Sequence, residues 1–410
     1  MVNSQRGGRA LAGLCCALGL LLVHGALSQG CAPPGRYYDN CPDGGTCSLP
    51  PDGGPIDTSP FLSKPVTVLH DGLHNSGADV VSFQGAAFAV SRNAKVWSPD
   101  GTAKLVITRS TDRGLTWSKS GELALKDKDL RTPKLAVDGG KLLVIATAWD
   151  WTQPDKHHTL VVGAGSTDGV TFTDLATLGL PDGSSAWRPR ALLGQLWLTA
   201  WSADEFYPSS AGGPLSIWVG GGATWVSNPA AMPVGGGARQ GELVLRKSGE
   251  LWAAIPERAV AGSSEKLTFC SSKLSAAPKW SCWSVGNLVV DSPALFEYVP
   301  DGASQGLLLF AAKHDIGEGK RRTGIWQVLD TDQGALLIAD LPGSQGDTGA
   351  PSVLPLDAGH ALLLFHSTSP LDAKVIALGT EPTEVQAQGG AFAADVFAVQ
   401  LDLGKATAGR

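Results

Sequence analysis

Two apolar stretches separated by a glycine-containing turn occur together six times along the chain. In each copy a small or charged residue precedes the first stretch, and the second stretch ends in polar or aromatic residues. The copies span 79–92, 131–149, 188–201, 242–258, 292–314 and 347–366. Their spacing of roughly 50 to 60 residues is the length of a four-stranded propeller blade. We therefore predict an all-β, six-bladed β-propeller in which each copy forms the two inner strands of a blade.

The sequence between the copies favours further strands over helices. Short apolar runs such as 141–145 and 307–310 are bounded by Gly, Pro, Asp and Ser, as strands usually are. Long amphipathic helical patterns are absent from the sequence. We assign the propeller to residues 61–410.

The N-terminus has the features of an export signal. Arg6 and Arg9 precede an apolar run over 10–23, and small residues lead to Gly30-Cys31. The run is shorter than the ~20 residues of a membrane-spanning helix. The segment 27–31 resembles a bacterial lipobox, so we predict a signal peptide over 1–30 and lipidation of Cys31. Ala32 favours the outer membrane; ordinary cleavage and secretion is the alternative.

The cysteines after the signal peptide agree with export. Cys41 lies close to Cys47, and Cys270 and Cys282 flank a hairpin-like stretch. Two local disulfides would use these four cysteines and leave Cys31 for the lipid. The Pro-, Gly- and Asp-rich segment 31–60 cannot build a core and is predicted to be a disordered tether. The membrane is thus expected as a partner only through the lipid.

Composition excludes several functions. The net charge is −6 and no basic stripe occurs, which argues against nucleic acid as a partner. No cysteine or histidine spacing fits a zinc site, and no G-x-S-x-G, H-E-x-x-H or phosphate-loop motif is found. We predict no metal and no cofactor, and we expect a monomer.

A second motif follows the inner strands of the first blades. Residues 110–117 read Ser-Thr-Asp-Arg-Gly-Leu-Thr-Trp, which matches S-x-D-x-G-x-T-W, the Asp-box. A copy one residue shorter lies at 166–172, and 221–225 keeps only the end. The aspartate is expected to bind turn amides, the glycine to adopt a conformation that other residues resist, and the aromatic ring to pack between sheets. The motif predicts a fold and marks no active site.

With these motifs, residues 61–410 resemble the sialidase superfamily of six-bladed propellers. The fourth copy begins at Glu242 and closes at Arg258, as a similar sialidase segment does. The resemblance implies that Glu242 activates a tyrosine nucleophile and that Arg258 binds the sialate carboxylate. Arg321 or Arg322 in the fifth copy would supply another arginine of that triad; the sequence does not choose between them.

The sequence departs from the family at two places. The R-I-P motif that gives the first triad arginine is replaced by 74–79, His-Asn-Ser-Gly-Ala-Asp. The tyrosine expected at the sixth blade is absent from 346–351. Outside the tether only Tyr207 and Tyr298 remain, and neither is expected at the site. Hydrolysis through a tyrosine nucleophile is therefore not predicted in its usual form.

The chain is also similar to a bacterial subgroup of sialidase-like propellers. That subgroup shows H-N-x-x-x-D-L early, then D-L-R-x-P, then L-P-x-x-G-D-T near the end. The corresponding stretches here lie at 74–79, 129–133 and 341–348, where 341–348 has one additional residue. This resemblance concerns the fold and assigns no substrate.

One face of the propeller is expected to collect binding groups. Antiparallel geometry brings the starts of the inner strands and the ends of their neighbours to the same face. Arginines bind carboxylates there and tryptophans stack on sugars, which favours an anionic glycan. The predicted binding residues are Arg131, Arg188, Arg258, Arg321, Arg322, Trp151, Trp201 and His366. The alternative is a solvated rim with structural ion pairs.

Three carboxylates are predicted near the axis. Asp79, Glu242 and Asp347 would provide an acid and a base if their pKa values were driven apart. Alternatively, Asp79 and Asp347 cap strand starts and pair with arginines. The sequence thus leaves three functions open: a sialidase-like glycoside hydrolase, a glycan-binding propeller without turnover, and a protein-interaction propeller.

Overall fold

The computed structural model describes most of the predicted propeller. The described residues are 37–38, 60–150, 158–202, 215–222, 224–228, 232–235, 237–258, 265–286, 288–304, 306–330, 333–378, 382–390 and 392–407. The signal peptide and Cys31, Cys41 and Cys47 lie outside them. Within this part of the chain, no helix is long and apolar enough to cross a membrane.

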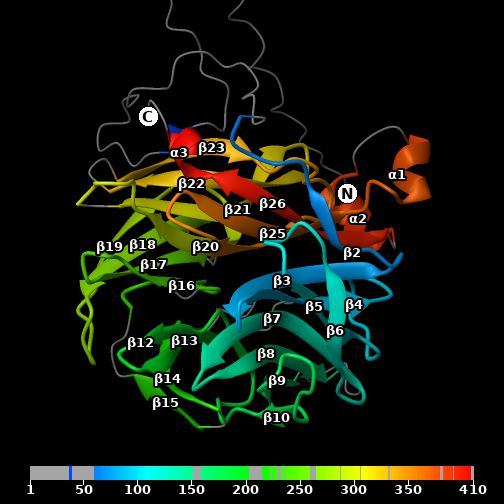
Figure 1. Ribbon diagram of the computed structural model, residues 1–410, viewed down its shortest axis with the longest axis horizontal. Helices are drawn as coiled ribbons and strands as arrows, with labels where there is room; N and C mark the ends of the chain where they lie inside the picture. The colour runs from blue at the N-terminus through cyan, green and yellow to red at the C-terminus, as the bar shows by residue number, and fades with distance from the viewer. Residues whose placement is uncertain are drawn as a thin grey trace, which may run out of the picture.

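The strands form five hydrogen-bonded sheets, and one of these contains two units. Its eight strands consist of two groups joined by a single parallel pairing of Ala394 with His74. Counted in this way, six units of four or five strands follow one another around the molecule (Figure 1). The arrangement confirms the predicted all-β propeller.

The strands of the units pair in chain order, with one exception in the third unit. The first unit has β3 (His74–Phe83), β4 (Ala86–Ala94), β5 (Lys104–Ser110) and β6 (Ser118–Leu123). The second has β7 (Lys128–Asp138), β8 (Lys141–Asp150), β9 (His158–Ser166) and β10 (Ala176–Thr177). The third has β11 (Ser184–Ala186), β12 (Arg190–Leu192), β13 (Gln195–Ser202), β14 (Ser216–Gly221) and β15 (Thr224–Asn228). There, β11 and β12 both pair with β13.

The second half of the chain repeats this order. The fourth unit has β16 (Glu242–Leu245), β17 (Glu250–Glu257), β18 (Lys266–Lys273) and β19 (Ser281–Val285). The fifth has β20 (Val290–Tyr298), β21 (Leu307–Gly317), β22 (Lys320–Leu329) and β23 (Gly334–Asp340). The sixth has β24 (Gly349–Pro355), β25 (His360–Thr368) and β26 (Ala394–Asp402), completed by β2 (Val66–Leu69).

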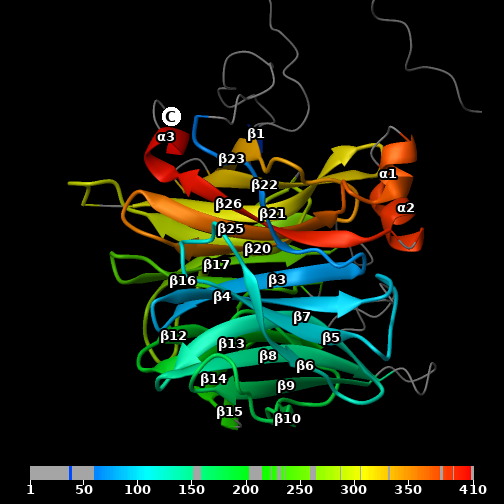
Figure 2. The ribbon, with the colours of Figure 1, turned by 45° about the vertical axis from the view of Figure 1, so that its right-hand side comes forward.

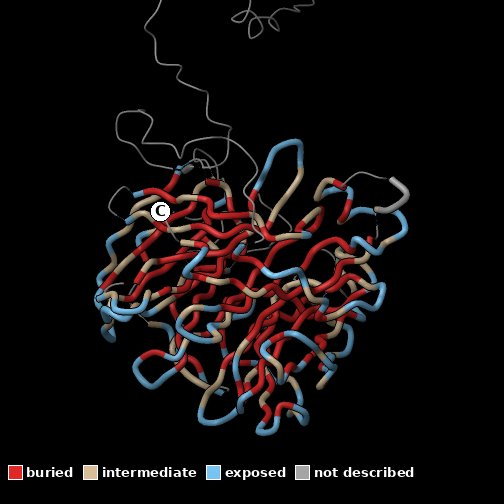
Figure 3. Tube along the Cα trace, turned by 45° about the horizontal axis from the view of Figure 1, so that its top comes forward, coloured by how far each residue is buried: buried red, intermediate tan, exposed pale blue. Residues whose placement is uncertain are grey.

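The hydrophobic core lies between the units and closes into a ring. Six clusters of buried side chains each join two neighbouring units, and the ring ends where the sixth unit packs on the first. An inner strand is therefore covered on both faces. In β21, Phe310 packs toward the fourth unit and Leu309 toward the sixth. This explains why the inner strands are continuous apolar runs. Figure 3 shows the buried parts of the trace inside the molecule and the exposed parts toward its edge.

The N-terminal segment completes the ring. Strand β2 pairs with β26, so residues from both ends of the propeller share the sixth unit. Phe61 and Leu62 are buried in the same core. Within the predicted tether, β1 (Tyr37–Tyr38) adds to the edge of β23, so the segment 31–60 is not without structure throughout.

The turns after β5 and β9 have the contacts expected of the Asp-box. Asp112 accepts hydrogen bonds from Thr116 N at 2.9 Å and from Ser110 Oγ at 2.8 Å. Trp117 donates from Nε1 to the carbonyl of Gly114 at 3.1 Å. Trp225 makes the same contact with Gly222. These turns fix the outer strands and lie away from the candidate site.

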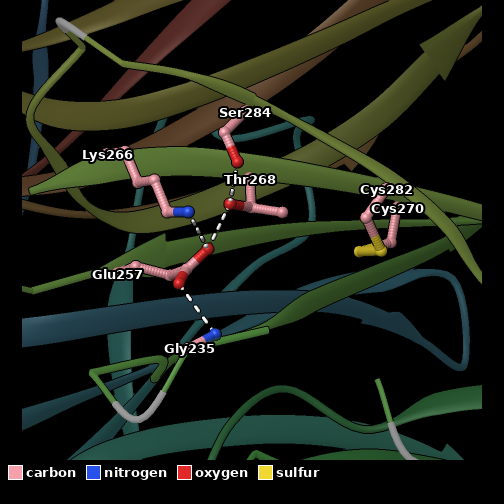
Figure 4. Close-up of a disulfide and its surroundings, with 7 residues drawn as sticks. All are labelled: Gly235, Glu257, Lys266, Thr268, Cys270, Cys282 and Ser284. Atoms are coloured by element: carbon pink, nitrogen blue, oxygen red, sulfur yellow. Dashed lines mark hydrogen bonds and ion pairs between the residues drawn. A yellow bond between two sulfur atoms is a disulfide. The ribbon is translucent and has the colours of Figure 1, made fainter. Parts of the chain in front are cut away.

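A disulfide joins two strands of the fourth unit, as predicted. Cys270 of β18 lies opposite Cys282 of β19 and the two are bonded (Figure 4). Closing a loop of this length is expected to stabilise the fold by about 3 kcal/mol.

Among the described residues, three short helices lie outside the ring. Helices α1 (Ala373–Leu378) and α2 (Glu384–Gly389) interrupt the sixth unit between β25 and β26. They lie on one side of the molecule, and α3 (Leu403–Thr407) lies on the other side (Figures 1 and 2).

Candidate active site

The innermost strands of four units carry a bulge near their first residues. The pairing shifts register within β3, β7, β20 and β24. The bulges contain Gly77, Thr132, Ser292 and Ala350, with φ values from +44° to +69°. Such values strain any residue except glycine, and three of these residues also precede a proline. Bulges and backbone strain of this kind concentrate at functional sites, where they direct side chains.

All four bulges line one cavity of about 370 Å³ on the propeller axis. It opens on the face where the inner strands begin, as expected for a propeller. Seven arginine and lysine side chains and five carboxylates line it. The residues that line the cavity therefore carry a surplus of positive charge, in a chain whose net charge is −6.

One wall comes from the first two units. The buried carboxylate of Asp129 accepts hydrogen bonds from Arg92 Nε at 2.8 Å and from Arg131 Nε at 2.9 Å. The Arg131 guanidinium lies over the rings of Trp97 and Trp149, 5.3 and 5.4 Å from their centroids. Burial would raise the pKa of Asp129, but Arg131 and Arg92 hold it below its usual value. Two guanidiniums thus share one buried carboxylate here.

The opposite wall comes from the fourth and fifth units. Asp291 Oδ2 lies 2.7 Å from Arg258 and 3.6 Å from Lys313 Nζ. Burial would raise the pKa of Asp291, but these two cations hold it well below its usual range. Arg258 remains half exposed and faces the cavity.

Glu257 extends this wall. It accepts a hydrogen bond from Gly235 N at 2.8 Å and one from Thr268, and Lys266 Nζ lies 3.6 Å away (Figure 4).

Asp347 lies between histidines at the start of the sixth unit. Its Oδ2 is 2.8 Å from His74 Nε2 and 3.9 Å from His366 Nε2, and its Oδ1 accepts a hydrogen bond from Gln388 at 2.9 Å. Burial would raise the pKa of Asp347, but the hydrogen bond from His74 holds it well below its usual range. Burial lowers the pKa of His366 to about 4, although Asp347 opposes the shift. An ionised carboxylate and a neutral imidazole therefore face the cavity at neutral pH.

Asp79 and Glu242 lie deeper on the axis and do not line the cavity. Both are fully buried, and Arg188 joins them through contacts of 2.7 Å to Asp79 and 2.6 Å to Glu242. Asp79 also accepts hydrogen bonds from Leu135 N and Ser352 Oγ. Burial would raise the pKa of Asp79, but Arg188 holds it below its usual value. This cluster joins different units and matches the structural alternative considered for Asp79.

Lys134 lies beside the same cluster. Its side chain is 1% exposed, and its Nζ lies 3.8 Å from the centroid of the Trp187 ring. Burial and repulsion from Arg188 lower the pKa of Lys134 to about 7.

The structure separates the predicted site residues into two groups. Those that line the cavity are Asp347, Arg131, Arg258, Arg321 and His366. Those that do not are Asp79, Glu242, Arg188, Arg322 and Trp201. Trp151 lies outside the described residues. Among the described tyrosines none lines the cavity, and Tyr298 lies near the opposite face, beside α3.

The sequence prediction missed the contribution of α2. Glu384 and Gln388 of this helix line the cavity, although no helix was expected there. The signal was present: Thr383 and Gln386 form a capping box, the T-x-x-Q pattern that begins a helix. Lys313 was also not among the predicted binding residues.

No protein-family model matches the sequence, and no curated protein matches it. Solved structures do. A protein of unknown function from Dyadobacter fermentans superposes with a TM-score of 0.61 at 14% identity, over 84% of this chain and 100% of that one. Trypanosoma rangeli sialidase in complex with the inhibitor DANA superposes with a TM-score of 0.57 at 14% identity, over 80% of this chain and 55% of that one.

A third likeness is to the GH93 α-L-arabinofuranosidase of Fusarium graminearum in complex with arabinobiose. Its TM-score is 0.55 at 16% identity, over 84% of this chain and 99% of that one. The chain has a sialidase-like propeller fold. At these identities the likeness shows the fold alone, and the chemistry must be argued from the cavity.

Proposed function

We propose that this protein is a glycosidase-like propeller that binds the terminal, acidic sugar of a glycan in the axial cavity. The observation that carries the proposal is the surplus of arginine and lysine around the cavity. Guanidinium groups bind carboxylates through charge-assisted hydrogen bonds. The cavity of about 370 Å³ is within the size range of small-ligand sites. The likeness to a sialidase and an arabinofuranosidase supports a sugar as the ligand.

We further propose hydrolysis with Asp347 as the reacting carboxylate. Asp347 occupies the start of the sixth unit, where the family resemblance expects a tyrosine. As an ionised group it can attack an anomeric carbon or take a proton from water. His74 and Gln388 orient it through hydrogen bonds of 2.8 and 2.9 Å. Asp79 and Glu242 are fully buried and do not line the cavity, so we do not propose either as the reacting carboxylate.

A glycan-binding protein without turnover is the second candidate. Three carboxylates of the cavity, Asp291, Asp347 and Glu384, have lowered pKa values because of their cationic or hydrogen-bonded partners. None of these three is therefore a proton donor to a leaving group at neutral pH. An activated aryl glycoside needs little protonation of its leaving group, so aryl glycosides are the appropriate first substrates.

We retain export and lipidation of Cys31 as part of the proposal. The disulfide between Cys270 and Cys282 is consistent with an oxidising compartment. The proposal is thus an outer-membrane lipoprotein that presents the cavity to glycans; a secreted form is the alternative.

The test measures turnover and binding in parallel. The wild type is assayed on aryl glycosides of N-acetylneuraminate, glucuronate and galacturonate, and calorimetry measures binding of the free acids and of galactose. Arg258→Ala should weaken binding of the acidic sugar about 10-fold or more, since a charged hydrogen bond contributes about 1.5–3 kcal/mol. Asp347→Asn should abolish turnover and retain binding.

Arg113→Ala is the matched control, because Arg113 also forms an ion pair, with Asp357, but on the opposite face. Equal losses in both arginine variants, or no binding of any acidic sugar by the wild type, would contradict the proposal. Binding without turnover would favour the second candidate.

A further inference from the structure

Helix α2 brings a carboxylate into the candidate site from outside the propeller ring. It belongs to the segment that interrupts the sixth unit between β25 and β26. Its capping box fixes its first turn, and Glu384 N donates to the carbonyl of Gly319 at 2.9 Å. That contact attaches α2 to the hairpin between β21 and β22. The capping box and the contact with Gly319 therefore both fix the backbone at Glu384, whose side chain faces the cavity.

The two oxygens of Glu384 contact two different cations. Oε1 lies 2.8 Å from Lys313 Nζ, and Oε2 lies 2.9 Å from Arg321 Nε. The side chain of Glu384 is 15% exposed, and all three groups line the cavity. This is how the carboxylate of a bound acid would engage a lysine and an arginine. Arg321 is also one of the arginines for which the family resemblance implies carboxylate binding.

Each of these cations has a second partner that does not depend on α2. Asp291 lies 3.6 Å from Lys313 Nζ, and Asp315 lies 2.5 Å from Arg321. Burial would lower the pKa of Lys313, but Glu384 and Asp291 raise it above its usual value. Asp291 and Asp315 would thus still face Lys313 and Arg321 if Glu384 were neutralised.

The same face of α2 covers Asp347. Gln388 follows Glu384 by one helical turn, donates to Asp347 Oδ1 at 2.9 Å and lies 3.4 Å from Glu384 Oε1. One short helix therefore contacts both the cation pair and the proposed reacting carboxylate. Glu384 belongs to the site, because the groups that it contacts also line the cavity.

We propose that Glu384 is a specificity-determining residue: it acts as a built-in carboxylate that competes with the carboxylate of a ligand for Lys313 and Arg321. The proposal rests on the proposed function, because it presumes that acidic sugars enter the cavity. In the wild type the competition weakens binding of acidic sugars relative to neutral ones. Glu384→Gln keeps the size of the side chain and removes the competing charge.

The test compares dissociation constants of four proteins by calorimetry, with N-acetylneuraminate, glucuronate and galactose as probes. Glu384→Gln should bind the acidic sugars about 10-fold or more tightly than the wild type, with binding of galactose unchanged. Glu318→Gln is the charge-matched control, since Glu318 lies on the adjacent hairpin and is 84% exposed; its affinities should equal those of the wild type. In Glu384→Gln/Arg321→Ala the gain should disappear.

The outcomes separate this inference from the proposed function. If the wild type binds an acidic sugar and Glu384→Gln binds it equally or more weakly, the inference is wrong and the proposed function stands. A gain that survives in the double variant would mean that α2 had merely loosened, which also overturns the inference. If no variant binds any acidic sugar, both proposals fall. Binding by Glu384→Gln alone would support the inference and contradict acidic-sugar binding by the wild type.

Discussion

At the scale of single residues, two aspartates of innermost strands have opposite environments. Asp79 lies inside β3, two residues after the bulge residue Gly77, whereas Asp347 lies just before β24, three residues before the bulge residue Ala350. Asp79 is sealed among Arg188, Leu135 and Ser352, whereas Asp347 lines the cavity. Each residue further along a strand lies about 3.3 Å deeper, so Asp79 lies well below the level of Asp347. On a narrow axis that difference in depth separates a binding surface from a core.

Asp79→Asn should therefore destabilise the fold. The substitution leaves Arg188 with one fewer buried countercharge, and breaking a buried ion pair typically costs about 3–5 kcal/mol. Urea unfolding at pH 7 should show that the free energy of unfolding is lower by about 3 kcal/mol than in the wild type. Asp357→Asn is the control, because its ion pair with Arg113 is exposed, and its midpoint should barely change. A stable but inactive Asp79→Asn would instead favour the predicted catalytic role.

At the scale of elements, the turns after β5 and β9 depend on glycine for two reasons. Gly169 has a φ of +73°, and a Cβ added there would overlap the ring of Phe88. Phe88 is itself buried between the first two units. The turn thus packs against a neighbouring unit as well as reversing its own chain. The motif at 166–172 is a packing device, which agrees with its distance from the cavity.

Gly169→Ala should destabilise the protein more than Gly85→Ala. Both glycines have φ near +75°, but nothing lies within 4 Å of a Cβ at Gly85. Gly85→Ala should cost about 1 kcal/mol from backbone strain. Gly169→Ala adds a steric overlap that costs roughly 1–3 kcal/mol. Thermal unfolding of the two variants measures the difference; equal losses would show that the Phe88 contact does not matter.

The bulges of the innermost strands are the elements that build the site. Thr132, Ser292 and Ala350 adopt positive φ directly before a proline. The sequence displays these X-Pro pairs, but it does not display the register shift. The register shift depends on how each innermost strand pairs with its neighbour near the axis, where the regular hydrogen bonding of the sheet ends.

At the scale of the whole molecule, stability depends on closing the ring. Six inter-unit clusters form a closed circle, and β2 adds the outermost strand of the sixth unit and one side chain to the cluster that joins the sixth unit to the first. Without β2, the outer edge of β26 would be unpaired and Val396 and Ala398 would lose Val68 as a neighbour.

Val68→Asp should weaken the packing of β2 on the sixth unit. Val68 is 8% exposed in β2, and burying a carboxylate there without a partner should lower the free energy of unfolding by about 3 kcal/mol. Thr67→Asp is the control, because the adjacent side chain is exposed. The free energy of unfolding in urea and the rate of proteolysis would be measured for both variants and the wild type. If both variants unfold like the wild type, the packing of β2 does not stabilise the sixth unit.

The sequence by itself determined the propeller, because the pattern that specifies a blade repeats along the chain. Apolar runs covered on both faces, turns that require glycine and a spacing near 50 to 60 residues restrict the fold without any long-range contact. It also determined the pairing of Cys270 with Cys282, since both lie in one hairpin. The residues at the strand starts were predicted to meet on one face, and Arg131, Arg258, Arg321, Asp347 and His366 do so.

Only the tertiary structure decided which of these residues reach the cavity. Depth along the axis places Asp79, Arg188 and Glu242 in the core, and this depth depends on bulge positions and on how six units converge. Glu384 enters the site from a helix between two strands of the last unit. Its partners Lys313 and Arg321 are over 60 residues away in sequence. Such contacts result from the closing of the ring, and a local pattern cannot contain them.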